Sequence, residues 1–234
     1  MLSQAPGTAV MISHAGIRYT QSAQCFDALQ MPPGSRKEHF EAGLDLSQAR
    51  EHIAREMSGE WLFFVDDDAM FAPDLLQRLL QRLDANPDVD AVSAYILRRW
   101  PPHYTVAGRL RSDGQADILN FDDASGLVRV DLTGLGGGAV IRKSAFDRVQ
   151  RPWFTGGTLT EDWTFCSRLL QVGGQPAVDL DVHAWHITPF AVLPTREDNG
   201  QWGVAYVPVR PGSQAMVVGH VTAASKMAEE PVAV

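Results

Sequence analysis

The stretch EWLFFVDDDAMFAPDLLQRLL, Glu60 to Leu80, places an apolar run, three acids and the start of a helix in one short segment. The unbroken apolar run Trp61 to Val65 has the length of a strand, and its lack of alternation is typical of a strand covered on both faces. Pro73 suits the first turn of a helix, and the leucines after it form one apolar stripe. Between them lie Asp66 to Asp68, whose carboxylates repel one another unless they stay in water or share a cation. The segment therefore predicts a buried strand that ends in an acidic site.

The segments around this stretch continue the alternation of strand and helix. Ala9 to Ser13 is a short apolar run, Asp45 to Met57 has helical spacing, and Ala91 to Leu97 is a further strand. This order is typical of a mostly parallel sheet with helices packed on its faces. Later short strands end at Ala177 to Ile187, and we expect loop beyond Pro194. We expect one domain over residues 1–195 and a C-terminal loop or tail over 196–234, a candidate cover for an active site.

Composition bounds the class of protein. The chain has 234 residues, is 45% hydrophobic and 21% charged, and has no segment apolar enough to span a membrane. It lacks a cationic leader, and Cys25 and Cys166 are too few for a disulfide framework, so a reducing cytoplasm is the expected setting. The net charge of −8 argues against a broad grip on nucleic-acid backbones, but not against a local basic groove.

The three acids after the first long apolar run are the first candidate site. Ligands of parallel sheets bind beyond the carboxyl ends of the strands, where these acids fall. In an extended chain Asp66 and Asp68 point to one side and Asp67 to the other. Two converging carboxylates make a partial shell for Mg²⁺ or Mn²⁺, whereas the alternative is an acidic turn that favours the following helix.

Glu161 and Asp162 form a second acidic site. Acids in the first turn of a helix interact favourably with its dipole, which is a sufficient structural explanation. They also follow the aromatic and glycine-rich loop PWFTGGT, where a carboxylate could take a proton from an acceptor hydroxyl. Near the end of the last strand, His186 shares the parity of the apolar residues, and it is either a satisfied core histidine or a third metal ligand.

The order of these motifs resembles that of the GT-A glycosyltransferases, in particular small family-two-like enzymes of bacteria and phages. The resemblance rests on the DDD stretch, GLGGGAVIRKSAF, TEDWTFCSRLLQVGG and the terminal WHIT, and it covers most of residues 9–190. It implies a Rossmann-like, mostly parallel sheet with helices on both faces and a small antiparallel second sheet. It also implies transfer of a hexose from a nucleotide sugar, a UDP-sugar above all, in a bacterial or phage-infected cytoplasm.

The resemblance further assigns roles to individual residues. Asp66 and Asp68 of the DxD motif and His186 would hold the metal ion, and Asp162 of the ED motif, beside Glu161, would be the catalytic base of an inverting reaction. Donor-binding residues would be Ser13, His14, Arg18, Arg50, Asp66, Asp67, Gly137 and Trp153. Many relatives have Arg-Asn where this chain has Arg50 and Glu51, so Glu51 has no assigned role.

The acceptor is the least determined partner. The loop YILRRWPPHY, with Arg98 and Trp100, could hold a sugar, a lipid phosphate or an extruded base, or it could be a surface loop. A glycan, a small molecule and a hydroxymethylated DNA base are all candidates, the last because phage relatives glycosylate such bases. The alternatives to a transferase are a phosphatase of the haloacid dehalogenase type, a sugar nucleotidylyltransferase and an inactive sugar-nucleotide-binding module.

Overall fold

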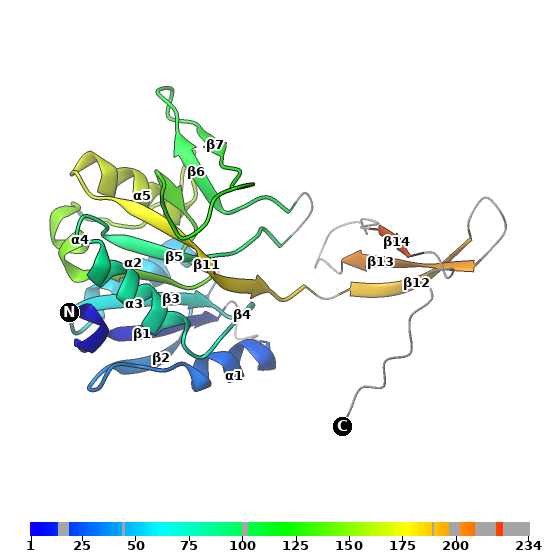
Figure 1. Ribbon diagram of the computed structural model, residues 1–234, viewed down its shortest axis with the longest axis horizontal. Coiled ribbons are helices and arrows are strands. Elements are labelled where there is room, and N and C mark those ends of the chain that lie inside the picture. The colour runs from blue at the N-terminus through cyan, green and yellow to red at the C-terminus, as the bar shows by residue number, and fades with distance from the viewer. Residues whose placement is uncertain are drawn as a thin grey trace. The chain divides into compact units, whose positions relative to one another are not determined.

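The computed structural model describes residues 1–13, 19–43, 45–99, 103–188, 190–196, 202–208 and 219–221 (Figure 1). The chain forms two compact units. The first comprises Met1–Arg98 and Pro102–Ile187, and the second comprises Arg99–Pro101 and Thr188–Val234. In the described part of the chain, no helix is both long and apolar enough to cross a membrane.

A large mixed sheet forms the centre of the first unit. Its order is β2-β1-β3-β10-β5-β11-β4, with β8 paired to β11. The pairings make β1, β2, β3, β5 and β11 parallel, so their carboxyl ends share one edge, whereas β4, β8 and β10 run antiparallel. The strand bounds are β1 Thr8–Ser13, β2 Arg36–Glu41, β3 Trp61–Asp66, β4 Ala69–Phe71, β5 Ala91–Tyr95, β8 Leu127–Arg129, β10 Ala139–Arg142 and β11 Pro176–His186.

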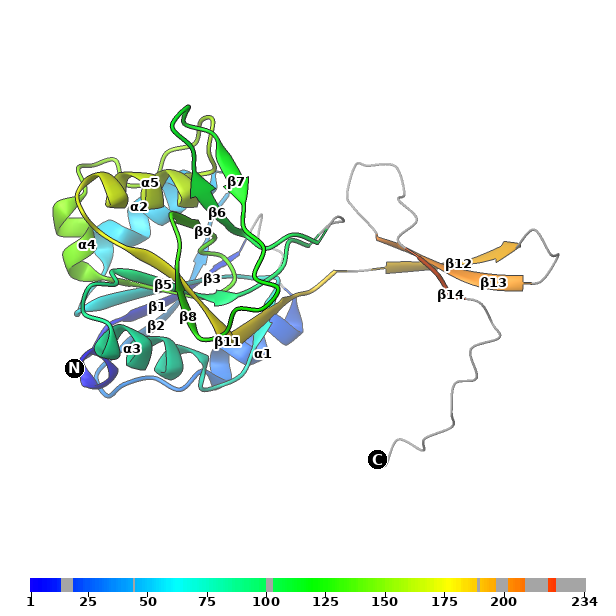
Figure 2. The ribbon, with the colours of Figure 1, turned by 45° about the horizontal axis from the view of Figure 1, so that its top comes forward.

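Helices cover both faces of this sheet, as predicted (Figure 2). Side chains of α1 and α3 belong to one apolar cluster, and those of α2, α4 and α5 belong to another. A short antiparallel sheet, β7-β6-β9, is the expected small second sheet. The bounds are η1 Leu2–Gln4, α1 Thr20–Ala28, α2 Leu46–Glu56, α3 Leu75–Ala85, α4 Lys143–Arg148, α5 Glu161–Gln171, β6 Ala107–Leu110, β7 Ala116–Ile118 and β9 Leu132–Thr133.

The apolar run at Trp61 to Val65 is the buried strand β3, as its composition predicts. Trp61, Phe63 and Val65 pack in the cluster of α1 and α3, and the alternate residues Leu62 and Phe64 pack in the cluster of α2, α4 and α5. Asp66 continues the parity of Leu62 and Phe64. Its carboxylate therefore faces α2 and α5.

The second unit differs from the expected loop. Beyond Ile187 the chain forms a three-stranded antiparallel sheet of β12 Phe190–Arg196, β13 Trp202–Pro208 and β14 Gly219–Val221. The boundary between the units therefore falls eight residues before the expected end of the first domain at residue 195. That the C-terminal segment covers the active site stays a prediction.

Candidate active site

A single buried arginine joins the two acidic motifs. Arg50 lies on α2, and its side chain is 1% exposed. Its Nη1 lies 2.5 Å from Glu161 Oε1, and its Nη2 lies 3.1 Å from Asp66 Oδ1. Asp162 Oδ2 is 4.0 Å from the same Nη1. The carboxyl end of β3 and the first turn of α5, far apart in the sequence, are thus held together by one guanidinium group.

Burial and charge act in opposite directions on these groups. Burial lowers the pKa of Arg50, but the charges of Asp66, Asp162 and Glu161 outweigh it and leave that pKa raised, so the guanidinium stays protonated. Burial raises the pKa of Glu161, and its ion pair with Arg50 offsets only part of that effect. Arg50 Nε is buried with no hydrogen-bond partner in the described residues, so the carboxylates satisfy only the far end of the side chain.

Asp162 has a different environment from its neighbour Glu161. Its Oδ1 accepts hydrogen bonds from the Thr160 hydroxyl and from the backbone N–H of Trp163. Its Oδ2 accepts a longer bond, 3.3 Å, from the backbone N–H of Leu135. The side chain is 16% exposed. Asp162 is therefore oriented through Oδ1, while Oδ2 faces the glycine-rich loop before β10.

The acids after β3 do not continue the strand, which corrects the expected geometry of Asp66 to Asp68. The strand ends at Asp66, and Asp67 and Asp68 form a turn into β4, so strand alternation does not place Asp68 beside Asp66. Both turn residues are buried. The carbonyl of Asp68 accepts a hydrogen bond from Ile187 N–H, 2.7 Å, which ties the turn to the end of β11.

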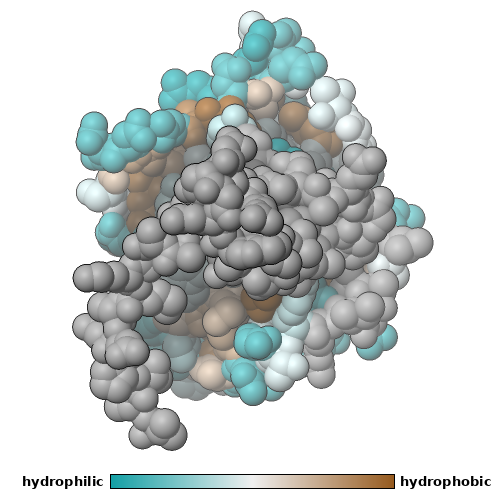
Figure 3. Space-filling model, turned by 90° about the vertical axis from the view of Figure 1, so that its right-hand side faces the viewer, coloured by the Kyte–Doolittle hydropathy of each residue, from teal (hydrophilic) through white to brown (hydrophobic). Residues whose placement is uncertain are grey.

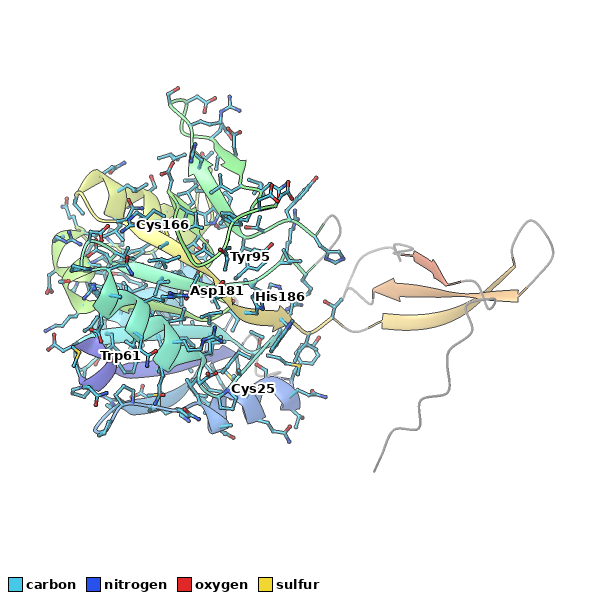
Figure 4. All side chains as sticks on the ribbon, in the orientation of Figure 1. Cys25, Trp61, Tyr95, Cys166, Asp181 and His186 are labelled. Carbon is cyan, nitrogen blue, oxygen red and sulfur yellow. The ribbon has the colours of Figure 1, made fainter. Side chains whose placement is uncertain are left out.

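His186 lies at this same place. It pairs with Ala69 across β4 and β11, so it is close in the sheet to the Asp68 turn. Its Nδ1 is 2.5 Å from the carbonyl oxygen of Leu97. A carbonyl only accepts, so we assign the proton to Nδ1, which gives the neutral ring its lone pair on Nε2, the form in which histidine binds metals. Figure 4 shows His186 at the carboxyl-end edge of the sheet.

These residues fit a metal ion held partly by substrate. Within the described ranges, no group of three or more His, Cys, Asp or Glu side chains converges as a metal site. Asp66, the Asp68 turn and His186 nevertheless gather at one edge, and Mg²⁺ in phosphate-binding sites commonly has one or two protein carboxylates plus phosphate oxygens. Such a shell, with few protein ligands, is the kind of metal site that these residues could supply.

Two residues that are predicted to bind the donor make packing contacts in the structure, which account for their positions. Trp153 is 6% exposed, and its indole N–H donates to the carbonyls of Phe146 and Val149 within the core. At Gly137 an added Cβ would lie 2.6 Å from Ile96 Cγ2, so this glycine is required for packing.

The remaining predicted residues are distributed as follows. Ser13 ends β1, is 4% exposed, and its carbonyl accepts from the N–H of Ala42. Arg50 contacts carboxylates from within the protein and does not present its guanidinium at the surface. Arg98 is exposed, and its N–H donates to the carbonyl of Tyr104. His14, Arg18 and Trp100 lie outside the described residues.

Sequence reasoning missed two residues of this site. An added Cβ at Gly136 would lie 2.0 Å from Asp66 Oδ2, so the loop approaches the carboxylate as closely as a glycine permits. Glu51 Oε2 accepts from the N–H groups of Trp153, 2.6 Å, and Phe154, 3.2 Å. Glu51 therefore anchors the loop that leads to α5. The glycine cluster signalled a close approach, but nothing near Glu51 in the sequence indicated its partner.

Comparisons with known proteins agree with this fold. The sequence profile of glycosyl transferase family 2 matches residues 20–150. The crystal structure of A197 from STIV superposes with a TM-score of 0.55 and 15% identity, over 83% of this chain and 92% of that one. The crystal structure of GalNAc-T7 with UDP, GalNAc and Mn²⁺ superposes with a TM-score of 0.56 and 13% identity, over 77% of this chain. This chain spans 43% of the GalNAc-T7 chain, and no curated protein matches its sequence at a significant level. At these identities the two likenesses show a shared fold.

Proposed function

The chain belongs to glycosyl transferase family 2, and from that premise we propose that it moves a hexose from a UDP-sugar to an acceptor hydroxyl. Family membership and the shared fold support glycosyltransferase activity in general. The choice of UDP and of Mn²⁺ or Mg²⁺ is supported by the relative that was crystallised with UDP, GalNAc and Mn²⁺. Acceptor candidates are a glycan and a hydroxymethylated DNA base.

One observation carries the proposal. Carboxylates from β3 and α5 converge on one buried guanidinium at the carboxyl-end edge of the sheet, where ligands of such folds bind. A buried arginine that served only stability would need one carboxylate partner, and leaving two more beside it is electrostatically unfavourable. The extra acids therefore point to a site that handles a cation and a proton.

In the proposed reaction Asp162 is the base. The acceptor oxygen forms a bond to the anomeric carbon while the bond from that carbon to the diphosphate oxygen breaks, which inverts the configuration and releases the nucleoside diphosphate. The hydroxyl proton passes to Asp162 Oδ2, which accepts the single hydrogen bond from Leu135. Glu161 is less suited to this step, because Arg50 Nη1 lies 2.5 Å from its Oε1.

The protein would hold the ion with Asp66, Asp68 and His186. When bound, a divalent ion neutralises the charge that develops on the leaving diphosphate. Arg50 fixes the direction of Asp66 through contacts of 3.1 and 3.3 Å to its two carboxylate oxygens. The backbone of Gly136 leaves room for that carboxylate.

Calorimetry and turnover assays together test the proposal. We expect UDP to bind in Mn²⁺ and to lose at least about 10-fold in affinity in EDTA, as is common when metal-shell contacts are lost. Asp162→Asn should keep UDP affinity and lose about 100-fold or more in turnover, whereas Glu161→Gln should keep more activity. Equal UDP affinity in EDTA would exclude the metal role. Hydrolysis of p-nitrophenyl phosphate without turnover of any nucleotide sugar would identify a phosphatase instead.

A further inference from the structure

Two adjoining hollows of the surface both have Tyr95 and Leu97 in their walls. The first, about 210 Å³, is also lined by His183 and Trp185 of β11. The second, about 280 Å³, is also lined by Tyr104, Thr105 and residues 118–120. Because the hollows share a wall, we treat them as one surface and call it the Tyr95–Leu97 groove. Tyr95 lies on β5, next to β11 in the sheet (Figure 4).

Exposed apolar side chains concentrate in this groove. In the described part of the chain six large hydrophobic residues are exposed, and four of them line the groove. They are Leu97 at 42%, Tyr104 at 51%, Ile118 at 46% and Trp185 at 55% exposure. Figure 3 shows patches of hydrophobic residues next to hydrophilic ones on the face that it draws. Exposed apolar side chains that cluster in one patch commonly mark an interaction site or a ligand groove, whereas singly scattered ones do not.

The groove is also free of formal charge along its described walls. No Asp, Glu, Lys or Arg is among its described lining residues, and its polar groups are hydroxyls, the Asn120 amide and two histidines. Arg98 is exposed next to Leu97 but does not line either hollow. An acceptor with phosphates would therefore find no cation on these walls, and the net charge of −8 would oppose its approach.

Backbone contacts connect the groove to both halves of the catalytic cluster. The Leu97 carbonyl accepts from His186 Nδ1 at 2.5 Å. On the other side Thr105 precedes Val106, whose carbonyl accepts from the N–H of Gly134 and from Trp163 Nε1 on α5. The walls of the groove are therefore fixed relative to the proposed metal site and to the helix that carries Asp162.

We propose that the Tyr95–Leu97 groove binds an uncharged saccharide, which is the acceptor of the reaction. This inference rests on the proposed function. A pyranose ring has an apolar face of C–H groups and an edge of hydroxyls. Trp185 and Tyr104 offer aromatic surfaces to the apolar face, while Thr105 and Asn120 offer hydrogen bonds to the hydroxyls.

The test compares two classes of ligand on the full chain. The wild type and the variants Trp185→Ala and Tyr104→Ala are applied to an array of neutral glycans, both without added salt and at about 0.5 M NaCl, where charge contacts are largely screened. The same proteins are titrated against DNA that contains 5-hydroxymethylcytosine. We expect binding of neutral glycans that resists salt and falls about 10-fold in each variant, the effect of losing an aromatic anchor. Tyr104→Phe keeps the ring and should retain most of the affinity. Val172→Ala, which removes an exposed apolar side chain at the far end of α5, is the matched control and should bind as the wild type does.

UDP binding in Mn²⁺ is measured on the same proteins to keep the two proposals separate. If UDP does not bind to the wild type, the proposed function fails. If UDP binds but no neutral glycan does, or if the alanine variants bind glycans as the wild type does, the saccharide groove is wrong and the proposed function stands. Binding of the modified DNA with steep salt dependence and no glycan binding would assign the acceptor to nucleic acid and overturn the inference.

Discussion

Replacing Gly136 by alanine should move a proposed metal ligand without changing any charge. The Cβ that the substitution adds would lie 2.0 Å from Asp66 Oδ2 and 2.6 Å from its Cγ. Gly136 is not among the glycines with positive φ, so an L side chain fits its backbone. The substitution therefore acts on the Asp66 carboxylate and not on the path of the loop.

The size of the effect follows from these contacts. Ordinary van der Waals contact begins near 3.4 Å, so the carboxylate must retreat by about 1 Å or more. Arg50 holds both carboxylate oxygens, at 3.1 and 3.3 Å, and resists that movement. A misplacement of about 1 Å can cost about 100-fold in rate. We expect a loss of this order in turnover and weaker Mn²⁺-dependent binding of UDP.

Gly137→Ala is the matched control. Its Cβ would meet the core side chain Ile96 at 2.6 Å, so it should lower the free energy of unfolding by about 1–3 kcal/mol, as overpacking does. At a temperature well below its melting transition it should bind UDP like the wild type. Calorimetry with UDP and Mn²⁺, together with urea denaturation, separates the two outcomes. Wild-type turnover and UDP affinity in Gly136→Ala would refute the placement of Asp66 in the donor site.

Three further predictions test the surroundings of this site. Burial raises the pKa of Glu161, so the folded protein binds a proton at this carboxyl more tightly than the unfolded chain does. The stability that the carboxyl contributes is therefore present below pH 4.5 and is lost as the pH rises through the raised pKa. The unfolding free energy of the wild type, measured against Glu161→Gln by denaturation, should fall over that window, and a flat difference would contradict the direction of the shift. Glu51→Gln should lower the unfolding free energy by about 1–3 kcal/mol, because the Glu51 carboxylate accepts hydrogen bonds from two buried N–H groups. Arg55→Gln, which removes the half-exposed ion-pair partner of Glu51, should lower it by less than about 1 kcal/mol. Equal losses in urea denaturation would argue against Glu51 as the anchor of the loop before α5. His186→Ala should weaken Mn²⁺-dependent UDP binding about 10-fold. His183→Ala should leave UDP binding unchanged, because the Nε2 of His183 contacts the Leu180 carbonyl. If calorimetry shows that His183→Ala weakens UDP binding and His186→Ala does not, the two histidines exchange roles.

The sequence contains enough to predict β3 and the acids at its end. The apolar run Trp61 to Val65 has the length of a strand. Because its five apolar residues do not alternate with polar ones, the strand is expected to be covered on both faces. Strand parity then sends Asp66 toward α2 and α5. Parity fails at the next residue, since the chain turns at Asp67, and a turn within a run of identical residues has no local signal.

The loops were less predictable because their contacts are distant in sequence. Trp153 follows proline in an aromatic and glycine-rich segment, which suggested a ligand-facing loop. Its burial depends on acceptors at Phe146 and Val149 and on Glu51, which is 102 residues away. A glycine cluster is compatible with a close approach of the backbone to another group, because glycine has no Cβ. Which glycine meets Asp66 and which meets Ile96 depends on the register of β10 beside β3.

The charges around Arg50 explain why donor binding should need a cation, whatever the exact ligand set. Asp66, Glu161 and Asp162 against one guanidinium give this group a formal net charge of −2 when all three acids are ionised. A nucleotide diphosphate would add more negative charge at the same edge of the sheet, where repulsion is stronger than in water because the side chains are mostly buried. The raised pKa of Glu161 shows that burial already disfavours its charged form. A divalent ion would offset this charge, whereas both terminal nitrogens of Arg50 are engaged by carboxylates and offer little to the phosphates. We therefore expect metal dependence from the charge of the cluster as well as from the positions of Asp66 and His186.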